Sequence, residues 1–115
     1  MKKAQKKPQE MPFLHKLVFD SIPKGRNNSI PISFLAERLG LTSKRRQINS
    51  IINDLIFKYN KPVGTSSDDE TKGIFIIQDH ADLKLAARTL NSRMNSLMER
   101  HKKLLDNYNN LKQEA

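Results

Sequence analysis

The chain has 115 residues, enough for one domain with a modest hydrophobic core and too few for two. It contains no cysteine, which excludes disulfides, thiolate metal sites and cysteine nucleophiles and favours the reducing cytoplasm as its compartment. No apolar run approaches the roughly 20 residues that span a bilayer, and no signal-peptide stretch follows the basic N-terminus, so we expect a soluble protein without a membrane partner.

The net charge of +9 arises in the first part of the chain. Residues 1–67 hold 13 Lys and Arg against four Asp and Glu, whereas residues 68–115 hold eight of each. Positive charge gathered in one part of a small protein favours a polyanionic partner, and nucleic acid is the commonest polyanion. Basic surfaces also keep proteins soluble, so charge alone does not decide between these interpretations.

Composition divides the chain into three segments. Residues 1–10 carry four lysines without apolar periodicity and are interpreted as a disordered basic arm. This arm could lie along phosphates, or it could be a solubilising tail or an expression remnant. Residues 11–80 are expected to form the folded domain, and residues 81–115 a C-terminal dimerisation helix.

Two helices are predicted before the main amphipathic segment. The first runs from Pro12 to about Ser21, where turn residues end it. A short extended piece, residues 30–32, then precedes a second helix with Ser33 as its N-cap and Gly40 at its end. The residues expected on the buried face of this second helix are Phe34, Leu35, Ala36 and Leu39.

The third helix, expected to begin at Thr42 or Ser43, has the clearest periodicity. Its apolar residues recur at i, i+3, i+4, i+7, i+8 and i+11, which places them on one buried face. These residues are Ile48, Ile51, Ile52, Leu55, Ile56 and Tyr59. Joined to the second helix through the short turn LGLTS, it completes a helix-turn-helix, whose second helix enters the major groove of DNA.

The polar face of the third helix carries side chains that can read DNA bases. Arginine pairs with guanine, asparagine with adenine, and serine is permissive. The candidates for base reading are Ser43, Arg46, Asn49, Ser50 and Asn53, and those for phosphate contact are Lys44, Arg45 and, on the following loop, Lys72. An ordinary solvated helix face is the alternative interpretation. Asp54 and Phe57 lie near the same face, and phosphate binding explains neither.

Two strands are predicted directly after the third helix, over residues 62–65 and 73–78. They flank a polar loop and would form a wing, although Asp68, Asp69 and Glu70 at its tip would repel phosphate. The expected fold class is therefore mainly α with a small β-hairpin wing: a winged helix-turn-helix followed by a long C-terminal coiled-coil helix.

A family pattern covers residues 30–79. The sequence LA..LG is followed by a basic helix of the form R..I..L, a proline-containing strand and a Gly-aromatic strand. The matching residues are Leu35, Ala36, Leu39, Gly40, Arg46, Ile48, Ile52, Leu55, Pro62, Gly73 and Phe75. The pattern resembles the winged helix-turn-helix domains of small phage and phage-like proteins. That resemblance implies sequence-specific binding of double-stranded DNA, in transcription regulation or replication.

The final helix contains neither Gly nor Pro from about residue 81 to residue 113, and Asp79 or Asp82 can serve its N-terminus. Leucine recurs every seven residues from Leu83, with Ala87, Met94, His101 and Tyr108 between, which is the 4-3 repeat of a coiled coil. The residues expected to pair copies of the chain are Leu83, Leu90, Met94, Leu97, Leu104, Tyr108 and Leu111.

The pattern leaves the form of self-association open. Leu85 and Ala86 suit packing of the first two turns on the helix's own domain, whereas beyond about Arg93 that domain offers no surface. Met98 and Leu105 flank the seam. Because Arg93 and Arg100 lack acidic partners in a parallel pair, a homodimer or higher homo-oligomer of either orientation is possible.

No enzymatic activity, metal or cofactor is expected. His15, His80 and His101 have no metal-ligand spacing, the four glycines form no phosphate-binding loop, and no nucleophile with a base and an orienting group can be assembled. The alternative to DNA binding is a winged-helix protein-interaction module that acts through its coiled coil and acidic wing. That alternative leaves the basic cluster of residues 44–46 without a role.

Overall fold

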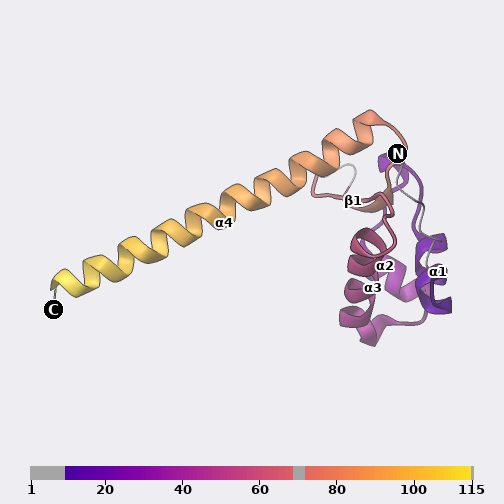
Figure 1. The fold of residues 1–115 in the computed structure, drawn as a ribbon, viewed down its shortest axis with the longest axis horizontal. Coiled ribbons are helices and arrows are strands. Elements are labelled where there is room, and N and C mark those ends of the chain that lie inside the picture. Colours follow the sequence, from indigo (N-terminus) through magenta and orange to yellow (C-terminus); the bar gives the residue numbers. More distant parts are fainter. Residues whose placement is uncertain (1–9, 69–71, 115) are drawn as a thin grey trace, which may run out of the picture.

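The computed structural model describes residues 10–68 and 72–114, which form a small helical domain and one long projecting helix (Figure 1). The elements before the hairpin are α1 Phe13–Ser21, the 3-10 turn η1 Arg26–Asn28, α2 Ile32–Arg38, the 3-10 turn η2 Thr42–Lys44 and α3 Arg45–Phe57. They are followed by β1 Val63–Ser66, β2 Gly73–Ile76 and α4 His80–Glu114. The predicted mainly helical fold with one hairpin is confirmed, and the expected basic arm lies outside the described residues except for Glu10.

The beginning of α2 differs from the prediction. Pro31, not Ser33, is the N-cap residue, and its carbonyl oxygen accepts hydrogen bonds from the backbone N–H groups of Phe34 and Leu35 at 3.0 and 3.2 Å. The prediction of Phe34 as a core residue is also wrong, because this residue is 50% exposed. Leu35 and Ala36 face inward, and the 100° step of a helix turns Phe34 away from them.

Gly40 closes the C-terminal end of helix α2, as the sequence predicts. Gly40 has a φ of 68°, and its N–H donates to the carbonyl of Glu37 while that of Leu41 donates to Ala36. Instead of continuing into the third helix at Thr42 or Ser43, the chain first forms η2. The buried residues of α3 are Ile48, Ile51, Ile52 and Leu55. Of the predicted buried face, Ile56 is 37% exposed, whereas Tyr59 lies beyond the end of α3 but is partly buried against the core.

The hairpin pairs β1 and β2 antiparallel, with Val63 opposite Ile76 and Ser66 opposite Gly73. The predicted strands are therefore correct within two residues at each end. On the other edge of β2, Ile30 forms an antiparallel bridge with Ile74. The segment before α2, β2 and β1 thus lie side by side in that order.

The hydrophobic core has two parts, one on each face of the hairpin. The larger part, which the helices α1 to α3 share with β2, contains Val18, Ile22, Leu35, Ala36, Ile48, Ile51, Ile52, Leu55, Ile74 and Ile76. The smaller part contains Phe75, Leu85 and Ala86, with Ile77 packed against them. Alternate residues of a strand point to opposite faces, so Phe75 meets α4 while its neighbours in β2 meet the helices.

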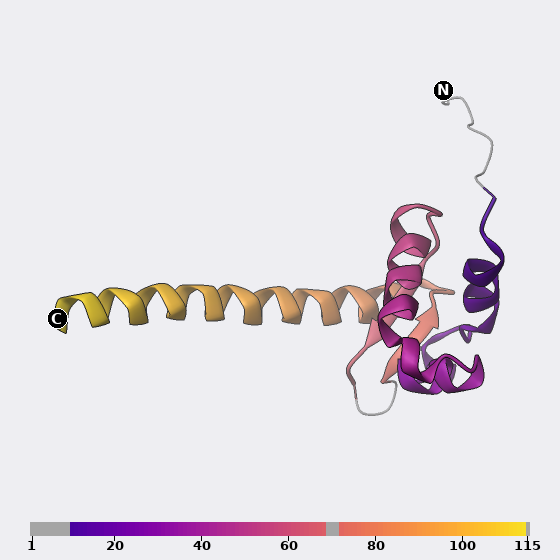
Figure 2. The same ribbon diagram turned by 90° about the horizontal axis from the view of Figure 1, so that it is seen from below.

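The final helix α4 crosses the hairpin and then leaves the domain, as Figures 1 and 2 show from two directions. Its close approach to β1 depends on Gly64. An added Cβ at Gly64 would lie 2.9 Å from the Cβ of Ala86 and 3.2 Å from Cγ1 of Ile77, which is closer than side-chain carbons normally pack. The described part of the molecule is consequently elongated, with extents of 58 × 42 × 29 Å.

Candidate nucleic-acid interface

The outer face of α3 is the first candidate surface. Ile48 and Leu55 are fully buried, and this fixes which side of α3 meets solvent. Every side chain predicted to read bases or contact phosphates is exposed: Ser43, Lys44, Arg45, Arg46, Asn49, Ser50, Asn53 and Lys72. The burial pattern therefore agrees with the predicted division of α3 into a core face and a polar face.

The structure groups these residues in space to different degrees. Arg46, Ser50 and Asn53 recur at i, i+4 and i+7 along α3, so they lie in one row opposite the core. Asn49 lies at the margin of that row. Ser43 and Lys44 belong to η2 rather than to α3, and Lys72 lies apart from them, immediately before β2.

The basic residues at the beginning of α3 are not engaged in ion pairs. Among residues 10–68 and 72–114, no carboxylate lies within 4.0 Å of a charged nitrogen of Lys44, Arg45 or Arg46. By contrast, Arg26 and Arg88 both pair with aspartates. The three charges of residues 44–46 are thus available to an external anion.

Asp54, which DNA binding left unexplained, contacts α1. Its Oδ2 lies 2.9 Å from Nε2 of His15, and the ring of His15 meets that of Tyr59 edge-on with centroids 5.8 Å apart. This pair fixes α1 against the C-terminal part of α3. The contact joins residues 39 positions apart in sequence. Phe57, in contrast, is 76% exposed at the end of α3 and has no packing role.

Asp68 of the hairpin loop contacts α4. Asp68 Oδ2 accepts a hydrogen bond from Nη2 of Arg88 at 3.0 Å, and both side chains are more than half exposed. This pair offsets one of the three negative charges predicted to oppose phosphate. Asp69 and Glu70 lie outside the described residues.

A buried carboxylate fastens the beginning of α4 to the domain. Asp82 is 1% exposed, and its Oδ1 accepts hydrogen bonds from Nη1 and the backbone N–H of Arg26 at 2.7 and 3.2 Å. Its Oδ2 accepts the N–H of Gln78 at 2.8 Å, while Asp79 Oδ1 accepts the N–H of Asp82. Both predicted acidic residues therefore serve the N-terminus of α4.

The ionised form of Asp82 is favoured. Burial by itself raises the pKa of this carboxyl, but the hydrogen bond from Gln78 N–H and the contacts with Arg26 outweigh burial and place the pKa below its ordinary value of 3.8. Asp82 is thus a permanent anion at neutral pH, held by Arg26 of η1.

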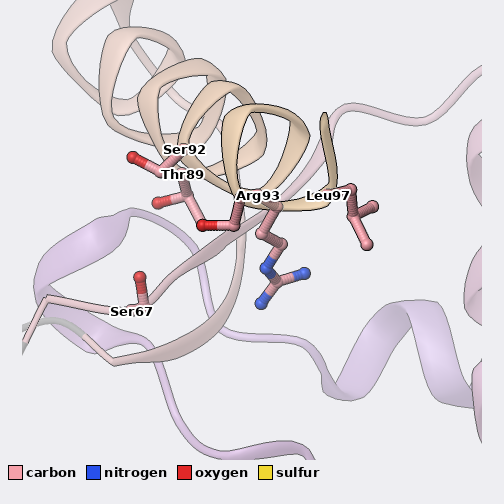
Figure 3. Close-up of a pocket in the computed structure, with 6 residues that line it drawn as sticks. Ser67, Thr89, Ser92, Arg93 and Leu97 are labelled. Carbon is pink, nitrogen blue, oxygen red and sulfur yellow. The ribbon is translucent and has the colours of Figure 1, made fainter. Parts of the chain in front are cut away.

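Contact between α4 and the domain ends after Thr89. Up to this point the side of α4 that faces the hairpin carries the buried residues Leu85, Ala86 and Thr89. The next turns place Ser92, Arg93, Ser96 and Leu97 around an open hollow of about 350 Å³, with Ser67 on its hairpin side (Figure 3). None of the α4 residues from 90 to 113 is buried, so beyond Thr89 the helix projects from the domain.

Beyond that point α4 presents a bare apolar stripe. All residues in 90–113 are exposed. The large apolar side chains of the stripe are between 53% and 67% exposed: Leu90, Met94, Leu97, Met98, Leu104, Leu105, Tyr108 and Leu111. Leu83, nearer the domain, is 47% exposed. An apolar surface of this length on one helix indicates a binding face, because isolated soluble proteins rarely expose one.

No family model, curated protein or solved structure matches the chain. Among residues 10–68 and 72–114, no helix combines the length and apolar character that crossing a bilayer requires. Within the same described residues, no three His, Asp or Glu side chains gather as ligands of a metal ion would.

Proposed function

We propose that residues 11–80 are a winged helix-turn-helix domain that binds double-stranded DNA sequence-specifically with α3 in the major groove. The observation that carries the proposal is the row Arg46, Ser50 and Asn53, which projects from α3 opposite its buried residues and is bordered by unpaired basic side chains. Arginine and asparagine are the side chains that form bidentate hydrogen bonds with guanine and adenine.

The order of elements supports this proposal. A glycine-closed turn joins α2 to α3, the antiparallel hairpin follows α3 directly, and Ile30 forms a bridge with the other edge of β2. This order of elements is the one that a helix-turn-helix with a wing requires, and it supports the proposal. The wing itself contributes little positive charge, because Lys72 is accompanied by Asp68.

We further propose that the protein acts as a homodimer or higher homo-oligomer through the stripe on α4. Burying a leucine side chain stabilises an interface by about 1.5 to 3 kcal/mol, and the stripe offers several in one row. Two linked domains would also bind DNA more tightly than one, because the second binding event becomes intramolecular.

Substitutions at the beginning of α3 test the proposal. After selection of bound fragments from random duplexes, Arg46→Ala should weaken binding to the preferred duplex by about 1 to 3 kcal/mol and relax base choice at one position. Lys44→Ala should weaken all sequences alike and reduce the salt slope by about one unit. Titrations at several salt concentrations, on the selected and on a scrambled duplex, separate these two effects.

Lys103→Ala is the matched control, since it removes one exposed charge from the side of α4 opposite the stripe and should change neither titration. If Arg46→Ala and Lys44→Ala weaken both duplexes equally, α3 is only an electrostatic patch. If neither has an effect, DNA binding through α3 is refuted. The protein-interaction alternative would then be favoured, with the α4 stripe as its surface.

A further inference from the structure

We infer that the partner on α4 is a second copy of the chain packed antiparallel over residues 91–113, which places the two DNA-binding domains at opposite ends of a rod. The inference deepens the self-association in the proposed function and rests on it. The available surface is well defined, because the α4 residues that the structure shows as buried all lie in its first turns: Asp82, Leu85, Ala86 and Thr89. The 24 residues 90–113 are free and extend about 36 Å at 1.5 Å per residue.

The two flanks of the stripe differ in chemistry. On one flank lie Met98 and Leu105, which are 67% and 53% exposed. On the other flank lie Arg93 and Arg100, which form no ion pair within the described part of the chain. The orientation of a partner helix decides which flank meets which.

A parallel partner mixes the two flanks. In each heptad of α4 the first core position is the one that Met94 or His101 occupies. In a parallel pair, the residue immediately before this position lies beside the residue five positions later on the other helix. Arg93 would then lie against the partner's Met98, and Arg100 against the partner's Leu105. Both arginines would then lie beside apolar side chains, without a carboxylate partner.

An antiparallel partner keeps the flanks apart, since each flank then meets its own counterpart. In one register, Met94 faces the partner's Leu111, Leu97 faces the partner's Tyr108, and His101 faces the partner's Leu104. Every core layer of this stretch is filled.

The same register brings Met98 against the partner's Leu105 on the apolar flank. On the basic flank it sets Arg100 beside the partner's Asn107, whose carbonyl can accept a hydrogen bond from a guanidinium.

Neighbouring registers are less favourable. A shift of one heptad in one direction places Arg100 against the partner's Arg100 and Leu105 against the partner's Asn91. The opposite shift places Met98 against the partner's Lys112. Only the register described above matches apolar with apolar and avoids contact between like charges.

This register determines where the domains lie. The overlap lies on the part of α4 that projects from the domain (Figure 1). The two copies of Ala86, where α4 contacts the hairpin, are separated by about 50 Å along the rod. In a parallel pair the two domains would instead share one end. Leu83 lies outside the antiparallel overlap and stays exposed.

Distance measurements on the full chain without DNA test the orientation. Because the chain contains no cysteine, a single cysteine introduced by Lys84→Cys can carry a spin label. Double electron–electron resonance should give about 55 Å between labels for the antiparallel pair and about 20 Å or less for a parallel one. Asn109→Cys is the matched control, because its labels lie about 20 Å apart in either orientation.

Each outcome decides a separate claim. A distance near 55 Å from Lys84→Cys together with a short one from Asn109→Cys supports the inference. Short distances from both variants overturn the antiparallel arrangement and leave self-association standing. The absence of any dipolar signal from both means a monomer, which refutes self-association as well, while DNA binding by the domain is judged independently by the Arg46 titrations.

A second measurement needs no label. In sedimentation equilibrium, Leu97→Ser should weaken association at least tenfold because Leu97 lies in the overlap, whereas Leu83→Ser should leave it unchanged. Equal weakening by both substitutions would mean that the interface reaches the domain end of α4, which contradicts the proposed register. Circular dichroism of both variants checks that α4 remains helical.

Discussion

Removing the carboxylate of Asp82 should loosen the contact between α4 and the rest of the domain. In Asp82→Ala, the backbone N–H groups of Gln78 and Arg26 lose their acceptor inside the protein, and the guanidinium of Arg26 loses its anion. Hydrogen bonds to charged groups contribute about 1.5 to 3 kcal/mol each. Arg26 is one-third exposed and can turn to water, so we expect a total loss of about 3 kcal/mol in the free energy of unfolding.

Urea and thermal unfolding measure this loss. For a small domain, about 3 kcal/mol corresponds to a decrease in Tm of about 12 to 24 °C. Asp106→Ala is the matched control, since it removes an exposed aspartate from the same helix and should change stability by less than about 0.5 kcal/mol. If Asp82→Ala unfolds at the same urea concentration and temperature as the wild type, the carboxylate of Asp82 does not fasten α4 to the domain.

The dependence on pH gives an independent check. The pKa of Asp82 is lower in the folded than in the unfolded protein, so the ionised carboxylate contributes fully to the free energy of unfolding at neutral pH. It is lost as the pH falls through the folded-state pKa, below 3.8. The wild type should therefore lose more stability than Asp82→Ala in acid, and the difference between them should narrow below about pH 4.

Three further predictions concern the hairpin and the stripe. Leu97→Asp combined with Leu104→Asp should give a monomer with a folded domain, because each charge would enter an apolar interface at a cost of several kcal/mol; light scattering that finds the wild type monomeric at tens of micromolar contradicts this. Gly64→Val should destabilise the protein by about 1 to 3 kcal/mol in urea unfolding, because its side chain would overlap that of Ala86. Serine at all of residues 68–70 should leave DNA affinity equal or higher, because repulsion of phosphate is removed; a marked loss at low salt would reveal an unforeseen contact.

The helices could be predicted from the sequence because their burial follows a local period. Ile48, Ile51, Ile52 and Leu55 of α3 recur at helical spacing and are buried as predicted. Leu85 and Ala86 of α4 meet the domain as expected. The apolar character of Phe34 predicts a core residue, but Leu35 and Ala36 occupy the inward side of a helix of only seven residues. Periodicity read together with the true helix start would have placed it outside.

The polar contacts that hold the elements together could not be predicted. The pairs of Asp54 with His15 and of Asp82 with Arg26 join residues 39 and 56 positions apart. Their geometry depends on how helices pack, and no local spacing encodes that. Within the candidate interface, the sequence indicated which residues of α3 are exposed, but not that Arg88 engages Asp68 of the hairpin.

The contact of α4 with the hairpin makes that helix a lever arm. Its pivot lies where Gly64 meets Ala86, and the arm beyond the domain is about 36 Å long. One degree of tilt at the pivot moves the far end by about 0.6 Å, so ten degrees moves it by roughly one helical turn. A side chain only slightly larger than glycine at position 64 would thus cause its largest displacement at the far end of α4, among residues that it does not contact.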